Sequence, residues 1–248
     1  MYITTTGLVL RETNYKESSK ILTVLTASEG KVTVSAKGAR RRGSKTASAT
    51  QLLAFSEMTL CETRGRFTLT EARSLELFEG LRQDIERLSL GSYFAEALEA
   101  ASDEDSPSTE ILSLGLNALF ALSEGKRQPA LVKAAFETRL AALAGFEPML
   151  DVCAVCGEEN PEEPYLSLSG GVLHCKSCHP DGSGMSAELC RDSLSAIRYI
   201  ISADAKRVFS FTIAGTARER LCRASEEYLL AQLGHSFRTL DFYRSIKS

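Results

Sequence analysis

Four cysteines in two matched pairs constrain this chain more than any other feature of its sequence. Cys153 and Cys156 form one C-x2-C pair, Cys175 and Cys178 form a second, and eighteen residues separate the pairs. Two cysteines three positions apart can turn both sulfurs toward one point, and two such pairs complete the tetrahedron of thiolates that Zn2+ prefers. The spacing predicts one structural zinc ion, because four protein ligands leave no open position for a reacting water.

The competing explanations of these cysteines are a redox pair and chance, and two matched pairs so close together disfavour both. His174 and His179 flank the second pair, but four thiolates at this spacing predict that neither histidine is a ligand. Seven cysteines are an odd number, which fits a closed set of disulfides poorly and fits a reducing cytoplasm. We expect the three remaining cysteines to be small buried hydrophobes: Cys61, Cys190 and Cys222.

The first 80 residues read as strands. Residues 31–36 alternate between apolar and polar side chains, and the neighbouring segments are rich in Thr, Val, Ile and Leu. The strands are expected at residues 2–12, 20–27, 31–36, 51–62 and 66–77. Five short strands with no helix between them predict a small closed or partly open barrel, of which the five-stranded oligonucleotide-binding (OB) fold is an example.

Helical periodicity begins near residue 82. Helices are expected at residues 84–101, 109–123, 129–144, 186–202 and 215–233. A segment rich in Gly, Pro and Cys, residues 151–182, interrupts them and carries the four cysteines. The predicted fold class is therefore α+β with two domains: an OB-like barrel over residues 1–80 and a helical domain over residues 81–248, with the zinc module inserted.

The charge is distributed unevenly. The chain has a net charge of -3, yet residues 1–82 hold 13 Lys and Arg against 8 Glu. The densest part is residues 37–45, which hold five bases and no acid: Lys37, Arg40, Arg41, Arg42 and Lys45. Such a run is often only a solvated surface, but on the basic part of an acidic protein it predicts contact with DNA phosphates. The aromatic residues of this part are expected mostly in the core: Tyr2, Tyr15, Phe55, Phe67 and Phe78.

Sequence motifs of enzymes are absent. The chain has neither the Lys-x-Asp-Gly motif of nucleotidyl-accepting ligases nor a Gly-x4-Gly-Lys-Ser/Thr phosphate loop, and it has only three histidines. We expect a protein that is not an enzyme. No apolar run approaches the length of a membrane span, so we expect no membrane association and a cytoplasmic location. The alternative function is a zinc-ribbon and OB nucleic-acid-binding factor of transcription or translation.

The order of these parts resembles the RecO family of bacterial DNA repair proteins, which are recombination mediators. The resemblance covers essentially the whole chain. It rests on the four cysteines and on Leu10-Arg11, Tyr15-Lys16-Glu17-Ser18, Leu25-Thr26, Lys37-Gly38-Ala39-Arg40-Arg41, Phe136-Glu137, Arg139-Leu140 and Gly145-Phe146-Glu147-Pro148. It implies a protein that works at the nucleoid. It also implies binding to single- and double-stranded DNA, annealing of complementary strands, and loading of the RecA recombinase onto single strands.

The resemblance also implies protein partners: RecR, often RecF, and the acidic, Phe-terminated tail of the single-stranded DNA-binding protein. Such a tail needs an apolar pocket for its ring and a basic rim for its carboxylates. The helix at 129–144 offers Phe136 and Leu140 on one face, with Lys133 and Arg139 as its bases. We therefore expect the tail at these four residues. The alternative is that Phe136 and Leu140 are core and the two bases are solvated.

Overall fold

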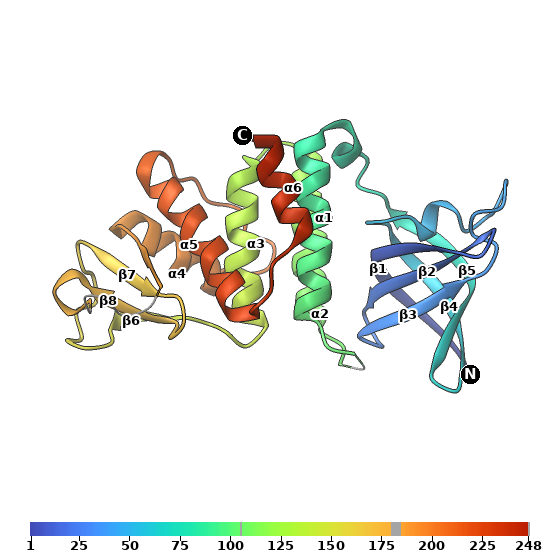
Figure 1. The fold of residues 1–248 in the computed structure, drawn as a ribbon, viewed down its shortest axis with the longest axis horizontal. Helices are drawn as coiled ribbons and strands as arrows, with labels where there is room; N and C mark the ends of the chain where they lie inside the picture. The colour runs from blue at the N-terminus through green and yellow to red at the C-terminus, as the bar shows by residue number, and fades with distance from the viewer. Residues whose placement is uncertain (105, 180–184, 248) are drawn as a thin grey trace. The chain divides into compact units, whose positions relative to one another are not determined.

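The structure is a computed structural model that describes residues 1–104, 106–179 and 185–247 (Figure 1). The chain forms two compact units: unit 1 consists of Met1–Glu124 with Phe237–Ser248, and unit 2 consists of Gly125–Ser236. This division differs from the expected domains 1–80 and 81–248, because three helices belong to the same unit as the barrel. Residues 180–182 of the predicted 151–182 module lie outside the described residues.

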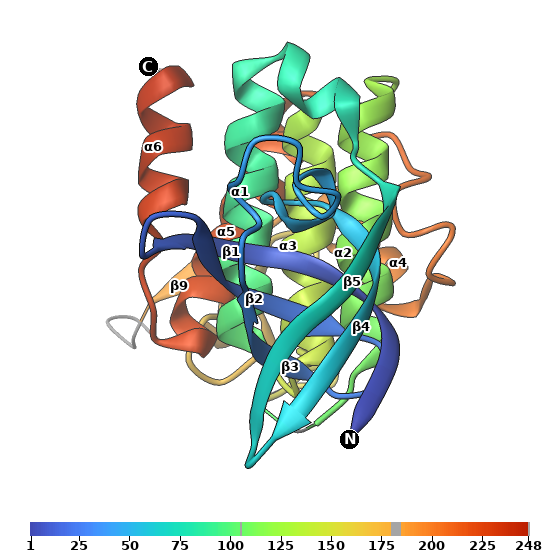
Figure 2. The same ribbon diagram turned by 90° about the vertical axis from the view of Figure 1, so that its right-hand side faces the viewer.

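Unit 1 contains the expected closed five-stranded barrel (Figures 1 and 2). Its strands are β1 (Tyr2–Tyr15), β2 (Ser19–Thr26), β3 (Lys31–Ala36), β4 (Phe55–Thr63) and β5 (Arg66–Glu76), in the order β1-β2-β3-β5-β4. The first half of β1 pairs with β4 and its second half with β2, so that β1 closes the barrel. Gly7 lies where the two pairings meet, and a Cβ added there would lie 2.6 Å from Val24 Cγ1.

The barrel interior is filled by the apolar residues that alternate along its strands, among them Val24, Val34 and Met58. Helices α1 (Ile85–Ala101) and α2 (Thr109–Glu124) follow the barrel, and α6 (Arg238–Lys247) packs on α1. The helices pack closely because small residues face their neighbours. A Cβ added to Gly115 of α2 would lie 2.6 Å from Leu98 Cδ1 of α1 and 3.7 Å from Leu8 Cδ2 of β1. These contacts explain why α1 and α2 belong with the barrel.

Unit 2 combines three helices with a small sheet. Helix α3 (Pro129–Leu143) packs against α4 (Arg191–Ser202) and α5 (Gly215–Leu233). The sheet has the order β6-β8-β7-β9, with β6 (Met149–Cys153), β7 (Pro164–Ser167), β8 (Val172–Cys175) and β9 (Ser186–Glu188). Two of the four predicted ligand cysteines lie in its strands, Cys153 at the end of β6 and Cys175 at the end of β8. The sheet therefore holds the candidate metal site.

Two segments differ from the sequence-based expectation. The helix expected from residue 186 begins at Arg191, because Ser186–Glu188 pairs with β7 as a strand. Helix α6 has no expected counterpart, since its apolar residues are few and their pattern is short. Three further 3-10 turns lie at Ser48–Thr50, Glu79–Gln83 and Lys176–Cys178. Among the described helices, none has both the length and the hydrophobicity needed to cross a bilayer.

Candidate functional site

The four predicted ligand cysteines converge on one point in unit 2. The Sγ atoms of Cys153, Cys156, Cys175 and Cys178 all lie within 4.8 Å of one another. One pair lies at the end of β6 and the turn after it, and the other at the end of β8 and the 3-10 turn after it. His179 instead bonds Ser186 Oγ through Nε2 at 2.7 Å. This cluster of thiols can hold a metal ion, and its donor set is the one that suits a thiophilic cation.

The electrostatics of the cluster favour a cation at its centre. Burial acts to raise the pKa of Cys153, but backbone N–H groups of Cys156, Val155 and Cys175 donate to its sulfur and lower that pKa to about 6. A hydrogen bond with Cys175 raises the pKa of Cys178 to about 12. Without a cation, one thiolate at this point discourages the ionisation of the next. A divalent ion removes that conflict.

Arg198 of α4 holds the first half of this module in place. Its guanidinium donates to the backbone carbonyls of Leu150 at 2.6 and 3.0 Å, Asp151 at 2.9 Å and Glu159 at 2.7 Å. It also donates to Asn160 Oδ1 at 3.1 Å. One side chain thus satisfies the carbonyls on both sides of the first cysteine pair. No sequence pattern pointed to this residue, because its partners are backbone atoms distant in sequence.

The three cysteines outside the cluster are half-buried, and the expectation that they are buried is wrong. Cys190 is the N-cap of α4, where burial acts to raise its pKa, but hydrogen bonds from Ser193 and neighbouring N–H groups lower it. Cys61 lies on the barrel and Cys222 on α5. None of the three joins the cluster within the described residues.

The basic loop of unit 1, residues 37–45, has a defined backbone. The N–H of Arg40 donates to Ser18 O at 2.9 Å, and the N–H of Gly38 donates to Ser19 Oγ at 3.3 Å, so the loop is attached to the β1–β2 turn. Ala39 is inserted into the barrel core. All five predicted bases of the loop are exposed. The loop therefore presents its cations from an ordered backbone, and this order lowers the entropic cost of binding a polyanion.

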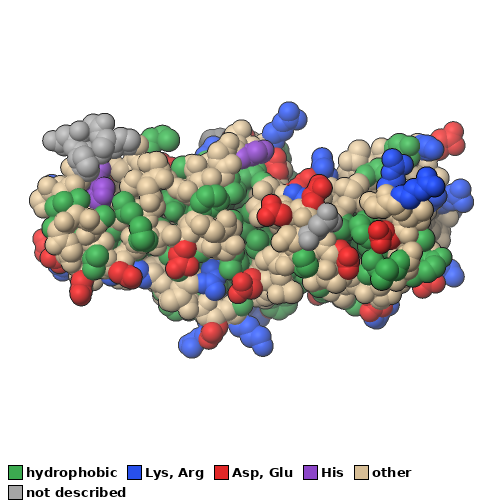
Figure 3. Space-filling model, turned by 90° about the horizontal axis from the view of Figure 1, so that it is seen from below, with side chains coloured by type: hydrophobic (Ala, Val, Ile, Leu, Met, Phe, Trp, Pro, Cys, Tyr) green, Lys and Arg blue, Asp and Glu red, His purple; other side chains and the backbone are tan. Residues whose placement is uncertain are grey.

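The 13 Lys and Arg of residues 1–82 divide by what they contact. Arg11, Lys20 and Arg73 form ion pairs with glutamates, while Lys31 and Arg82 donate to backbone carbonyls. The other eight have no carboxylate at ion-pair distance among the described residues. They are Lys16 with Lys37, Arg40, Arg41, Arg42 and Lys45 around the loop, and Arg64 with Arg66 at the β4–β5 turn. Figure 3 shows Lys and Arg side chains on the face of the barrel that is seen from below, at the right of the view.

An exposed aromatic ring accompanies the loop. The side chain of Tyr15 is 47% exposed, and Lys16 Nζ lies 5.3 Å from the centre of its ring. Glu17 is the one acid of this turn, and it is exposed. The expectation that the aromatic residues of the barrel are mostly core is wrong for Tyr15 and for Tyr2, which is 70% exposed. Both lie on outward positions of β1, and a strand's alternation alone does not say which of its faces meets the core.

The residues predicted to bind the partner tail are mostly core. Phe136 and Leu140 are fully buried, which matches the alternative left open in the sequence. Lys133 is also buried, with its Nζ 2.7 Å from Glu137 Oε1 and 2.6 Å from Glu226 Oε2, so it is neither a rim residue nor solvated. Arg139 is partly exposed and donates to Ile200 O at 3.5 Å. These four residues therefore do not form the predicted pocket for the tail.

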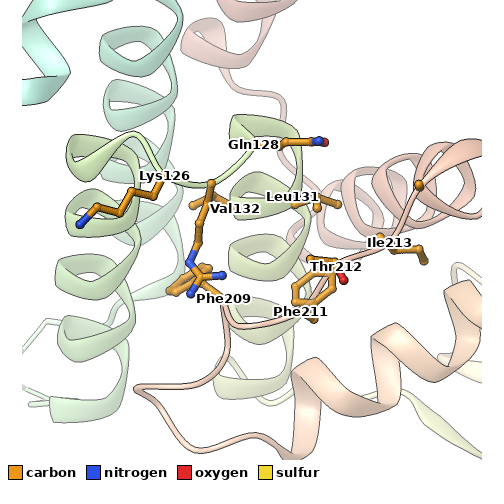
Figure 4. Close-up of a pocket in the computed structure, with 10 residues that line it drawn as sticks. Lys126, Gln128, Leu131, Val132, Phe209, Phe211, Thr212 and Ile213 are labelled. Carbon is orange, nitrogen blue, oxygen red and sulfur yellow. The ribbon is translucent and has the colours of Figure 1, made fainter.

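The same helix borders a different pocket, of about 460 Å³, at its N-terminal end (Figure 4). Its apolar lining comes from Leu131 and Val132 of α3 and from the segment before α5, which supplies Phe209, Phe211 and Ile213. Lys126 and Arg127 border it, and Arg127 donates to Ser210 Oγ at 3.2 Å. The pocket thus combines an apolar interior with a basic border, and its halves are about 80 residues apart in sequence.

Comparison with known proteins gives a match along nearly the entire chain. Residues 1–78 match the family model described as recombination protein O N terminal, and residues 82–241 match recombination protein O C terminal. The chain is 29% identical to a DNA repair protein RecO of Acetivibrio thermocellus, over 99% of this chain and 97% of the relative. It is 30% identical to that of Symbiobacterium thermophilum, over 98% and 96%, and 29% identical to that of Caldicellulosiruptor bescii, over 99% of both.

Proposed function

Because the chain belongs to the RecO family, we propose that it is a recombination mediator of DNA repair, which anneals complementary strands and helps to load the RecA recombinase onto single strands. The observation that carries this proposal is the set of eight barrel cations without a carboxylate partner, six of them around one shaped loop. Cations left without an internal partner are available to phosphates. The proposed location is the cytoplasm, at the nucleoid.

Annealing in this proposal needs no covalent chemistry. Two complementary strands repel each other through their phosphates, and a surface that neutralises phosphates on both strands lowers that barrier. The ring of Tyr15 adds a platform on which an unpaired base can stack beside the loop. Contacts of this kind are independent of base identity, so binding should be weakly selective for sequence and sensitive to salt.

The test is the salt dependence of binding to single-stranded DNA. About five phosphate contacts from the loop give a slope of roughly -3.5 in log K against log salt. Replacing Arg40, Arg41 and Arg42 with Gln should flatten the slope to about -1.4 and abolish annealing. The matched control replaces Arg11, Arg73 and Arg82, which have partners within the protein, by Gln. Equal slopes for wild type and loop variant would contradict the assignment.

The four thiols support one Zn2+ as the proposed metal. Zinc bound there would be structural, because the protein would fill all four tetrahedral positions. It would link the two cysteine pairs. Cys153, Cys156, Cys175 and Cys178 would hold it, with their thiolates formed as protons leave. Elemental analysis of protein purified without chelator should find one zinc per chain, and its absence would remove this part of the proposal.

The pocket bordered by Lys126 and Arg127 supports the proposed interaction with the acidic, Phe-terminated tail of the single-stranded DNA-binding protein. Its apolar interior suits the terminal ring and its border suits the carboxylates. Arg127→Glu should weaken a labelled tail peptide about tenfold in fluorescence anisotropy, and a peptide without its final Phe should bind equally weakly. Arg191→Glu, an exposed site at the far end of α4, is the control. RecR and RecF are proposed partners on the family resemblance alone.

A further inference from the structure

The β4–β5 turn carries two arginines that the fold does not use. Arg64 and Gly65 form a two-residue connection between Thr63 and Arg66, with φ values of +53° and +71°. Such turns favour Asn-Gly, because the first position is in the left-handed region where side chains other than Asn, Asp and Gly are unfavourable. Neither Arg64 nor Arg66 has a carboxylate at ion-pair distance among the described residues. Local turn chemistry therefore does not explain an arginine at position 64.

An exposed ring lies on the same outer face of the barrel. Tyr2 pairs with Cys61, and Cys61 pairs with Thr68. Thr63, two residues after Cys61, pairs with Arg66, and Cys61 Sγ lies 4.0 Å from Thr63 Oγ1. Because directly paired residues share a face of a sheet, Tyr2 and Arg66 belong to one face. The Tyr2 side chain is 70% exposed.

This surface lies at the other end of the barrel from the basic loop. Figures 1 and 2 both place the connection between β3 and β4 at one end of the barrel and the β4–β5 turn at the other. Strand β5 links the two ends: Ser74 Oγ lies 3.5 Å from Ser48 Oγ just after the loop, while Arg66 begins the strand. Eight residues of strand span about 26 Å.

We propose that Tyr2, Arg64 and Arg66 form a second binding site for single-stranded DNA, so that one barrel holds two strands at once. The inference rests on the proposed function and deepens it. An unpaired base stacks on Tyr2 while the two arginines contact phosphates, which is the combination that non-specific single-strand sites use. The same pairing of an exposed tyrosine with unpartnered cations occurs at Tyr15 and the loop.

Two sites on one barrel would explain how a protein could anneal strands without covalent catalysis. A strand held at the loop meets a strand held at the β4–β5 turn at an effective concentration set by their separation on the barrel, not by the bulk solution. Neutralisation of phosphates at both ends lowers the repulsion as the strands approach. Loss of the second site should therefore slow annealing while leaving capture of the first strand intact.

The experiment counts strands per chain with a three-nucleotide oligothymidylate, which is too short to bridge ends about 26 Å apart even when its backbone is fully extended. Fluorescence titration of the full chain at low salt should give two strands per chain for wild type. R64Q/R66Q should bind one, anneal longer complements about tenfold more slowly, and lower the salt slope of annealing by about 1.4. Tyr2→Ala should slow annealing about tenfold, and Tyr2→Phe should restore the rate because it keeps the ring.

The matched control is Arg73→Gln against Arg66→Gln. Both arginines are exposed on β5, but Arg73 already pairs with Glu57. Arg73→Gln should keep two strands per chain. Two strands per chain and a wild-type annealing rate in R64Q/R66Q would overturn the second site, even if the loop variant R40Q/R41Q/R42Q fails to anneal. A wild-type chain that does not anneal at all would instead overturn the proposed function.

Discussion

The basic side chains around the loop of unit 1 and those that support the interior of unit 2 are used in opposite ways. Around the loop of residues 37–45, the cations are exposed, and among the described residues no carboxylate lies at ion-pair distance from them. In unit 2, Lys133 is buried between two glutamates, and Arg198 donates to three backbone carbonyls. Arg220 likewise pairs with Glu188 and donates to Leu189 O.

The difference shows that net charge alone does not locate a binding surface. When a cation has a buried partner inside the protein, binding a phosphate instead would leave that partner unpaired. An unpaired buried charge costs several kcal/mol. A cation that contacts only water loses little when a phosphate replaces the water. The +5 charge of residues 1–82 is thus a guide only because most of its bases are of the second kind. Four variants, in order of decreasing effect on stability, test this contrast.

The largest effect is expected for Cys153→Ser. Structural zinc contributes about 10–16 kcal/mol to the folding of zinc-finger peptides, so its loss should unfold the small sheet and weaken all of unit 2. The barrel should keep its affinity for single-stranded DNA, because its core is separate. Calorimetry with a DNA-binding assay on the same sample measures both. Cys61→Ser in the barrel is the control, and equal melting of the two variants would argue against a metal at the cluster.

Lys133→Met should destabilise unit 2 by about 3–5 kcal/mol, because Glu137 would remain buried without its cation. Burial acts to lower the pKa of Lys133, but Glu137 and Glu226 raise it above 10.5. A group with a raised pKa contributes fully below its unfolded value and loses its effect as pH rises through the folded one. The contribution of Lys133 should therefore be fully present from about pH 6 to pH 9, and the deficit in urea unfolding should not shrink as pH rises through that range. A deficit that shrinks across that range would contradict this account.

Arg198→Gln should cost about 2–3 kcal/mol, since hydrogen bonds from a charged donor contribute about 1.5–3 kcal/mol each and water replaces some of them. Arg198→Lys should recover only part of this loss, because an ammonium group cannot reproduce the planar fork that reaches Leu150, Asp151 and Glu159. Faster transfer of metal to a chelator is a second measure. Arg191→Gln, which removes an exposed pair with Glu162, should change neither quantity.

The smallest effect on stability is expected where the effect on DNA binding is largest. Replacing Arg40, Arg41 and Arg42 with Gln should change the free energy of unfolding by less than about 0.5 kcal/mol, as for most surface substitutions. Removal of their mutual repulsion can even make the change slightly favourable. Urea unfolding of the loop variant beside Lys133→Met gives the comparison directly. Similar losses in the two variants would mean that the loop cations also hold the fold.

Local patterns determined most of the architecture. Alternation at residues 31–36 and a composition rich in Thr, Val, Ile and Leu in the neighbouring segments placed the five barrel strands within a few residues. Helical periodicity placed α2, α3 and α5 with nearly the observed bounds. The spacing of the cysteines was enough to predict their convergence, because two short turns of fixed geometry aim four sulfurs at one point. Such features depend on residues near one another in sequence. They are therefore visible without a fold.

Only the tertiary structure decided which equivalent-looking residues are available to a ligand. Phe136 and Lys133 read as a pocket and its rim, but α5 covers that face of α3 and supplies Glu226 to Lys133. Tyr2 and Tyr15 read as core, but they lie outside the closed barrel. Burial depends on what packs against a face, and the element that packs there can be distant in the chain, as α5 is from α3. The composition of a helix or strand cannot reveal them, so partnered and unpartnered cations separate only in the folded molecule.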